Sequence, residues 1–203
     1  MNTSSYFPAI EVESSQGIRE VSLITRHLMN RRIFLRGEIN GQTADDFLSE
    51  FLYLEQEPDK PVTIYVNSPG GEINAGLMIY DIIRSSRMKI NMVCTGMAAS
   101  MAAILVAGGQ KGRRYILPHS RMMIHEPLIG GGVGGSATSI KNISESILKT
   151  RDITNGILAE HTGKSPEEID KATSFDNYMD ASQAIEFGLC DMITETIFID
   201  ETE

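Results

Sequence analysis

The sequence has few cysteines, and their spacing forms neither a disulfide framework nor a zinc site. Cys94 and Cys190 are the two cysteines among 203 residues, and each lies in an apolar stretch. Both are therefore predicted to be buried and reduced. The first residues also lack a basic start followed by an apolar run, so no signal peptide is indicated and a cytoplasmic location is expected.

Positive charge is scarce as well. The chain has 18 Lys and Arg residues against 27 Asp and Glu residues, a formal net charge of −9. This balance argues against nucleic acid or an anionic membrane surface as a main partner. The longest uncharged stretch, residues 90–110, could suggest a membrane span. Thr95, Gly96 and Ser100 interrupt it, so a strand leading into a buried helix is the better prediction.

Several motifs that would indicate other chemistry are missing. The sequence contains no P-loop, so it cannot hydrolyse ATP through that motif, and its glycine spacing is not the dinucleotide-binding fingerprint. The G-x-S-x-G motif of the α/β-hydrolases is also absent. Neither internal repeats nor a low-complexity linker divides the chain. Its length and its 41% hydrophobic content predict one domain with a substantial core.

The first half of the chain alternates predicted strands with predicted helices. Short apolar runs predict strands, and apolar residues spaced by three and four predict helices. Thr43 is predicted to cap the first of these helices with Asp45 and Asp46 in its first turn, and Gly96 to open the helix that carries Ser100. This alternation predicts right-handed crossovers and a largely parallel sheet. The strands are predicted at residues 32–36, 62–66, 90–94, 114–116 and 122–124.

The second half is predicted to be mainly helical. A Gly-rich segment, residues 130–135, precedes a long helix that ends near Gly163. Ser165 with Glu168, and Asp180 with Gln183, predict the starts of two further helices. Residues 189–193 are predicted to form a closing strand. Residues 1–20 show no clear period and are interpreted as a mobile arm.

Three local features could carry chemistry. Ser100 lies in a run of small residues near a predicted helix start, where backbone amides converge. The turn at residues 69–71 has two glycines, whose amides could face an oxyanion. His125 ends an apolar strand and is followed, two residues later, by a proline. Taken alone, each feature has a purely structural interpretation. The serine would allow close helix packing, the glycines would form a tight turn, and the histidine would be a structural residue whose hydrogen bonds are made within the fold. Together they match the nucleophile, oxyanion site and base of an acyl-transfer enzyme.

The segments around these residues resemble, in order and spacing, the signature segments of the ClpP peptidase family. The resemblance extends from about Phe34 to Ile193. The matching segments are NSPGG (67–71), GMAASMA (96–102), MIHEPL (123–128), LAEHTG (158–163), DNYM (176–179) and AIEFGL (184–189). The resemblance implies an α/β fold of the crotonase-like (ClpP) type, with repeated β-β-α units in the head and a protruding strand–helix handle.

The resemblance also implies roles for individual residues. Ser100 matches the nucleophile, His125 the base and Asp176 the acid of a serine peptidase. Gly71 and Met101 match the backbone amide donors of the oxyanion hole. Neither a cofactor nor a metal is implied for this chain, since ATP would be used by a partner unfoldase.

The implied assembly is a pair of stacked seven-membered rings that enclose a chamber for unfolded polypeptides. An AAA+ unfoldase such as ClpX, ClpA or ClpC would feed that chamber. Residues 1–20 would be an axial arm that could include a short propeptide, residues 21–203 one peptidase domain, and residues 126–160 the handle. Ser174 and Phe175 stand where the family commonly has charged residues, and the handle has extra glycines. Pairing with a ring of a ClpP paralogue is therefore an alternative to self-pairing.

Two other functions fit part of the same pattern. A crotonase-type acyl-CoA enzyme also uses glycine amides to bind an oxyanion, but usually works with carboxylates and without a serine nucleophile. A structural ring subunit that needs an active paralogue would be non-enzymatic. Covalent labelling of Ser100 separates the first alternative from a peptidase, and the complete set of matching triad residues argues against the second.

Overall fold

A mostly parallel sheet organises the chain, and its strands end where the candidate site lies. The structure is a computed structural model that describes residues 8–14, 17–130 and 134–199. The sheet runs in the order β3 (Arg32–Ile39), β4 (Val62–Gly71), β5 (Ile90–Ala99), β6 (Arg114–Ile116) and β9 (Met192–Ile193), all parallel. β7 (Arg121–Ile124) pairs in parallel with the C-terminal end of β5, and β8 (Asn177–Met179) pairs antiparallel with β7.

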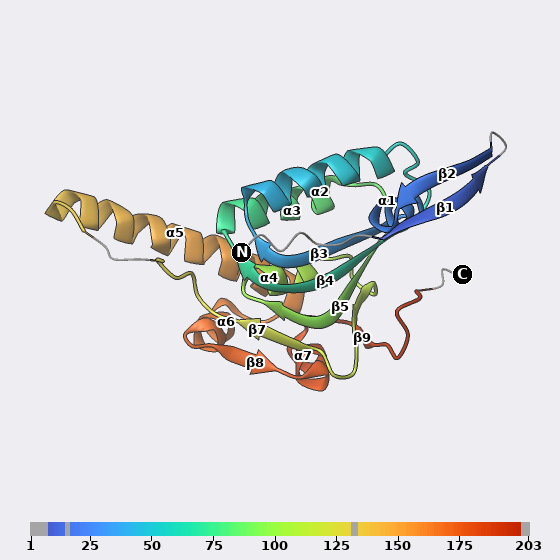
Figure 1. The fold of residues 1–203 in the computed structure, drawn as a ribbon. Helices are drawn as coiled ribbons and strands as arrows, with labels where there is room; N and C mark the ends of the chain where they lie inside the picture. Colours follow the sequence, from blue (N-terminus) through green and yellow to red (C-terminus); the bar gives the residue numbers. More distant parts are fainter. Residues whose placement is uncertain (1–7, 15–16, 131–133, 200–203) are drawn as a thin grey trace.

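Helices enclose this sheet and provide the core with it. Figure 1 shows α2 and α3 side by side over β3 and β4, with α6 and α7 near β7 and β8. Every residue of α4 is buried, and α4 contacts β4, β5, α3 and α5. Fully burying each large apolar side chain contributes roughly 1.5–3 kcal/mol, so this central helix stabilises the fold strongly. The helices are α1 (Leu23–Met29), α2 (Gly41–Leu54), α3 (Ile73–Ser85), α4 (Met101–Ala107), α5 (Ala137–Thr162), α6 (Pro166–Thr173) and α7 (Ala181–Phe187).

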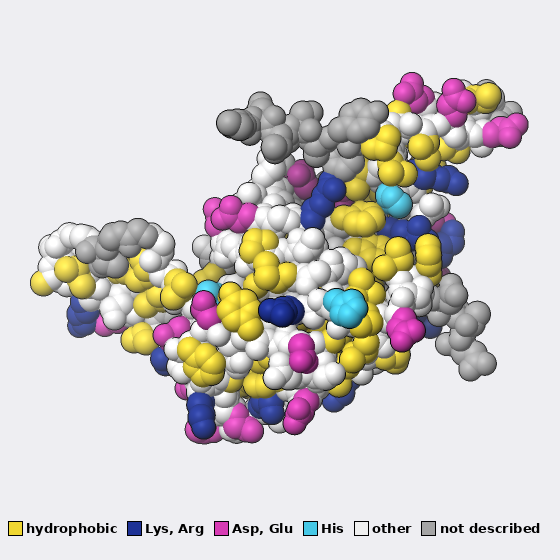
Figure 2. Space-filling model, turned by 60° about the horizontal axis from the view of Figure 1, so that its bottom comes forward, with side chains coloured by type: hydrophobic (Ala, Val, Ile, Leu, Met, Phe, Trp, Pro, Cys, Tyr) yellow, Lys and Arg dark blue, Asp and Glu magenta, His cyan; other side chains and the backbone are white. Residues whose placement is uncertain are grey.

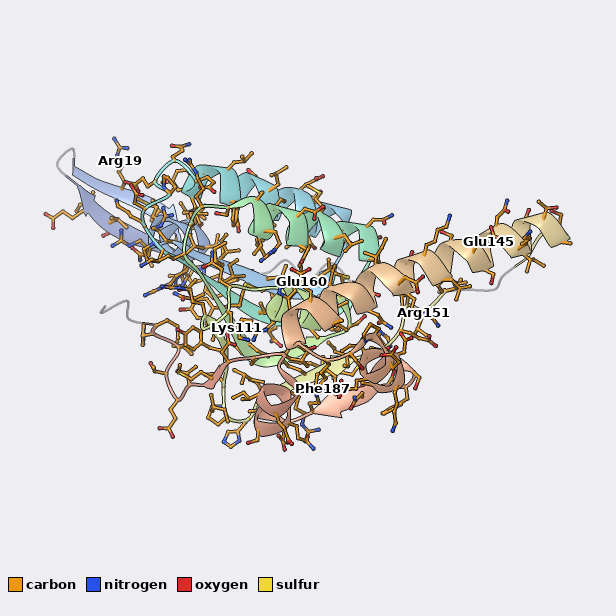
Figure 3. The ribbon with its side chains drawn as sticks, turned by 180° about the vertical axis from the view of Figure 1, so that it is seen from behind. Arg19, Lys111, Glu145, Arg151, Glu160 and Phe187 are labelled. Atoms are coloured by element: carbon orange, nitrogen blue, oxygen red, sulfur yellow. The ribbon has the colours of Figure 1, made fainter. Side chains whose placement is uncertain are left out.

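The helical part of the expected handle is α5, which projects far from the head (Figure 1). Figure 3 places Glu145 towards its free end, Arg151 further inward and Glu160 where the helix meets the head. Three large apolar side chains on α5, Ile140, Leu148 and Ile153, are exposed, and Figure 2 shows apolar side chains along the projection. The expected strand of the handle is not seen in residues 125–130 or 134–136, and residues 131–133 lie outside the described part.

The inner end of α5 is fixed to α3 by a partly buried contact. The Tyr80 hydroxyl and His161 Nε2 lie 2.8 Å apart, within hydrogen-bonding distance. Burial lowers the pKa of His161, and this effect outweighs the opposing influence of nearby Glu160. Because burial disfavours the imidazolium form, this joint between handle and head favours a neutral histidine.

The N-terminal region, interpreted from the sequence as a mobile arm, contains regular structure. β1 (Ala9–Ser14) and β2 (Gly17–Ser22) form an antiparallel hairpin. It projects from the head at the end away from α5 (Figure 1). Alternation of apolar and charged residues in β1 is the signal for this hairpin. The expected arm also includes residues 1–7 and 15–16, which lie outside the described part of the chain.

Three predicted element boundaries were wrong. Asn40, not Thr43, caps α2: its side chain accepts a hydrogen bond from the Thr43 amide, and the first turn contains no acidic residue. Gly96 does not open a helix, because β5 continues to Ala99 and α4 begins at Met101. Residues 67–71 are not a free turn, because β4 runs on to Gly71 and pairs with β3 across a register shift.

Other local predictions are confirmed. Ser165 with Glu168, and Asp180 with Gln183, both form complete capping boxes. Gly163 ends α5 in the left-handed conformation, with φ of 75°. The closing strand is shorter than predicted, since β9 contains only residues 192–193, and β8 was missed.

The two cysteines are free and buried, as expected. Burial raises the pKa of the Cys94 thiol to about 12 and also raises that of Cys190, so both thiols stay protonated. In the part of the chain that the structure describes, no helix is long and apolar enough to cross a membrane.

Candidate active site

Ser100 occupies a strained junction between β5 and α4. Its backbone φ of 54° and ψ of −123° lie outside the regions that non-glycine residues commonly adopt. Such strain costs roughly 1–3 kcal/mol and is concentrated at functional sites. The Ser100 amide donates a 2.8 Å hydrogen bond to the Met123 carbonyl, which fixes this backbone against β7. This strained strand–helix turn forms although the sequence lacks the G-x-S-x-G elbow motif.

Strand register places His125 beside Ser100. Ala99 and Met123 are partners in the parallel β5–β7 pair. Ser100 directly follows the end of β5, and His125 directly follows the end of β7. His125 Nε2 lies 2.8 Å from Ser100 Oγ. The Glu126 amide donates a 2.7 Å bond to the Thr173 carbonyl, which holds the segment after the strand against α6. The hydrogen-bonded pair therefore rests on backbone contacts to two neighbouring elements.

Asp176 reaches His125 through the antiparallel β7–β8 pair. Ile124 and Asn177 are the last partners of that pair, so the next residues, His125 and Asp176, face each other. The distance from His125 Nδ1 to Asp176 Oδ1 is 3.2 Å. The Asp176 side chain is 62% exposed, whereas that of His125 is 16% exposed. Three neighbouring strands thus bring Ser100, His125 and Asp176 into one line of hydrogen bonds.

Of the two glycines that follow Pro69, Gly70 allows β4 to approach Ser100 closely and Gly71 allows it to approach β3. A Cβ on Gly70 would lie 2.6 Å from the Ala99 carbonyl oxygen and 2.8 Å from Ser100 Cβ. A Cβ on Gly71 would lie 2.0 Å from the Ile39 carbonyl oxygen. Buried Ser68 fixes this backbone, because its hydroxyl donates to the Gly37 carbonyl and accepts from the Gly70 amide. Only glycine fits at these two positions.

The expected oxyanion donors, Gly71 and Met101, belong to two backbone segments close to the serine. Gly71 ends β4 and lines the same cavity as Ser100. Met101 is the first residue of α4, where helix amides have no partner within the helix. Its side chain is buried and packs under Gly76, where a Cβ would lie 2.1 Å from Met101 Cγ. The fold therefore brings both predicted positions next to the serine.

A cavity of about 690 Å³ opens in front of Ser100 and His125. Four of its polar residues, Glu38, Glu72, Asn74 and Thr150, carried no functional signal in the sequence. They come from β3, from α3 and its N-cap residue, and from α5, and only the strand register and the handle position bring them to the site. The cavity is lined by Glu38, Pro69, Gly71, Glu72, Ile73, Asn74, Ser100, Met123, His125, Pro127, Leu128, Gly130 and Thr150.

A buried ion pair supports the elements behind the site. Arg114 Nε donates to Asp191 Oδ2 at 2.9 Å, and Arg114 Nη1 donates to the carbonyls of Ala107, His161 and Gly188 at the ends of α4, α5 and α7. Burial would raise the pKa of Asp191, but hydrogen bonds from Arg114 and Gly112 outweigh it and lower this pKa. One guanidinium thus joins three helix ends.

The whole-chain comparison agrees with this architecture. A family model described as Clp protease matches residues 15–197. The chain belongs to the Clp protease family. The ClpP-type resemblance and the mixed α/β, crotonase-like fold are therefore confirmed, and the family identifies the chain as a peptidase, a hydrolase. Among the described residues of this Clp protease, no group of three or more His, Cys, Asp or Glu side chains could hold a metal ion.

Proposed function

We propose that this chain is the serine endopeptidase subunit of an ATP-dependent Clp protease and cleaves unfolded polypeptides into short peptides. The observation that carries the proposal is the continuous hydrogen-bonded line from Ser100 Oγ through His125 to Asp176, with distances of 2.8 and 3.2 Å. A serine hydroxyl is a weak nucleophile until a base removes its proton. This arrangement provides both the base and the group that orients it.

The direction of the hydrogen bonds follows from which atoms can donate. The Asp176 carboxylate can only accept, so His125 Nδ1–H donates to it and leaves Nε2 as the acceptor. The Ser100 hydroxyl then donates to Nε2 and loses its proton there as Oγ attacks the peptide carbonyl. His125 returns that proton to the leaving amine, and water repeats the cycle to release the acyl group.

The proposed oxyanion donors are the amides of Gly71 and Met101. They belong to two different backbone segments, and the close approach at Gly70 brings those segments together beside Ser100. Such donors stabilise the negative oxygen of the tetrahedral intermediate, and removing one typically costs about 2.7–4 kcal/mol. The donors act through the backbone, so side-chain changes at Met101 would alter them only indirectly.

We also propose that the chain works inside stacked seven-membered rings, paired with themselves or with a ring of a ClpP paralogue. The exposed apolar side chains Ile140, Leu148 and Ile153 on α5 support an interface on the handle. An AAA+ unfoldase such as ClpX, ClpA or ClpC would supply unfolded substrate, with the N-terminal arm beside the axial pore. Mass photometry across a dilution series measures which ring assembly forms.

Hydrolysis of an internally quenched peptide by the assembled protein tests the proposed chemistry. Wild-type protein should cleave short peptides without nucleotide, and Ser100→Ala should abolish cleavage. Peptidase activity that persists in a verified Ser100→Ala preparation would contradict the assignment. The same preparations are assayed for turnover of an enoyl-CoA, because a crotonase-type enzyme would keep that activity without a serine nucleophile.

A further inference from the structure

The cavity beside the candidate triad contains two carboxylates that the proposed reaction does not use. Glu38 and Glu72 both line it, together with apolar Ile73, Met123 and Leu128. Both glutamates are exposed. In the lining formed by described residues, His125 is the only side chain that can carry positive charge. The substrate cavity is therefore partly apolar and carries a local excess of negative charge.

Strand register and position in the chain determine where the backbone of each glutamate lies relative to the site. Glu38 is the β3 partner of Gly70, and Gly70 lies against Ser100. Because neighbouring strands are about 4.8 Å apart, the Glu38 backbone lies about 10 Å from Ser100, a span of about three extended substrate residues. Glu72 directly follows Gly71, so their Cα atoms are about 3.8 Å apart. The Glu72 backbone thus lies next to the proposed oxyanion donor Gly71, and the Glu38 backbone lies about 10 Å from the nucleophile.

Neither carboxylate is engaged in holding the fold. Glu72 is the N-cap residue of α3 but makes no side-chain capping hydrogen bond. Among the described residues, neither Glu38 nor Glu72 forms a salt bridge. The two side chains are therefore available to a ligand. A primary ammonium or guanidinium group is the chemistry that an unpaired carboxylate recognises.

We propose that Glu38 and Glu72 are specificity-determining residues that favour polypeptides with a lysine or arginine within three residues of the scissile bond. The inference rests on the proposed peptidase function of the same site. Ile73, Met123 and Leu128 accept an apolar side chain, while the carboxylates attract the neighbouring basic one. The selected substrate class is a segment that combines an apolar residue with a nearby cation.

The size of the preference follows from the exposure of the two groups. An exposed ion pair is favourable by about 1.4- to 5-fold in an equilibrium constant, so each carboxylate is expected to contribute about threefold and the two together about tenfold. The preference should weaken between low and high salt, because the Debye length falls from about 10 Å at 0.1 M to about 3 Å at 1 M. Steric selection by the apolar part of the cavity would not respond to salt in this way.

Matched internally quenched peptides test the inference on the assembled protein. A neutral parent peptide is first cleaved and its scissile bond mapped by mass spectrometry. Lysine, norleucine or glutamate is then placed at each of the three positions on either side, since norleucine has the lysine chain without its charge. We expect kcat/KM to be about tenfold higher for lysine than for norleucine at one or more positions, and lower again for glutamate.

Charge-neutralising variants assign that preference to the cavity. Glu72→Gln and Glu38→Gln should each reduce the lysine-to-norleucine ratio by about threefold, and Glu72→Lys should favour the glutamate peptide. Glu167→Gln, at an exposed position in the first turn of α6, makes the same change in net charge and should leave the ratio unaltered. Loss of the preference in high salt with unaltered protein provides a second measurement that needs no variant.

Two outcomes overturn different claims. Labelling of Ser100 by a fluorophosphonate without lysine-selective cleavage would overturn the specificity inference and leave the proposed function standing. A lysine preference that survives both Gln substitutions would also overturn it. Failure of Ser100 to be labelled at all would overturn the proposed function, and the inference with it.

Discussion

Replacing Asp176 with asparagine isolates the contribution of the third member of the candidate triad. The amide keeps the size of the side chain but removes its negative charge. It can also donate to His125 Nδ1, which would favour the tautomer whose Nε2 carries the proton. That tautomer cannot accept the Ser100 proton. The substitution should therefore lower kcat far more than it changes peptide binding.

The exposure of Asp176 sets the expected size of the loss. At the 3.2 Å separation of Nδ1 and Oδ1, Coulomb's law brackets the attraction between imidazolium and carboxylate. It gives about 1.3 kcal/mol in bulk water and about 5 kcal/mol at an effective dielectric constant of about 20. Because the Asp176 side chain is 62% exposed, the true value lies inside this bracket. We expect kcat/KM to fall by about 100-fold, less than the roughly 10⁴-fold loss when a buried triad aspartate is replaced.

The assay is hydrolysis of a neutral internally quenched peptide by ring assemblies of matched size. Asp59→Asn is the control, because Asp59 is an exposed aspartate before β4, at the end of that strand opposite the glycines. It should have activity within twofold of wild type. A loss below threefold for Asp176→Asn would refute the orienting role. A loss as complete as that of Ser100→Ala would refute the reasoning from exposure.

Three further predictions concern the scaffold. Arg114→Met should lower the free energy of unfolding by about 3–5 kcal/mol, because it leaves the Asp191 carboxylate, whose side chain is only 14% exposed, without its partner. Urea denaturation should show a smaller loss for Arg114→Met with Asp191→Leu, and equal losses would argue against this. Burial lowers the pKa of His161, so the contribution of this residue to the free energy of unfolding should be fully present above the usual histidine pKa near 6.5. That contribution should be lost progressively as the pH drops below this value. His161→Phe should flatten that dependence in denaturation curves, and an unchanged slope would point to other groups. Gly70→Ala should cost roughly 1–3 kcal/mol of stability through backbone strain. It should also reduce peptide hydrolysis at least tenfold, because the added Cβ would press on Ser100. A normal kcat in a folded variant would contradict the close approach of β4 to Ser100.

Local signals in the sequence predicted the parts of the fold that depend on local contacts. The capping boxes at Ser165 and Asp180 were predicted correctly because a helix N-terminus is satisfied by residues three apart. The end of β5 was predicted wrongly, because Gly96 was interpreted as the start of a helix and strand pairing overrides that signal. Pairing of residues 97–99 with β7 keeps the chain extended as far as Ala99.

The candidate site shows the same division. The neighbouring sequence indicated Ser100 and His125 as candidates, whereas only the resemblance to the ClpP family indicated Asp176. Its approach to His125 depends on the antiparallel β7–β8 pair, which joins segments about fifty residues apart and has a short, weakly patterned second strand. Glu38 and Glu72 had no local signal either, because their place in the cavity follows from the registers of β3 and β4.

Mass spectrometry of the fluorophosphonate adduct tests the central claim that Ser100 is an activated nucleophile. Wild-type protein should gain one adduct, and peptide mapping should place it on Ser100. His125→Ala should be labelled at least a hundredfold more slowly, because the serine would lack its base. An adduct on another residue, or equal labelling of wild type and His125→Ala, would contradict the proposed serine peptidase mechanism.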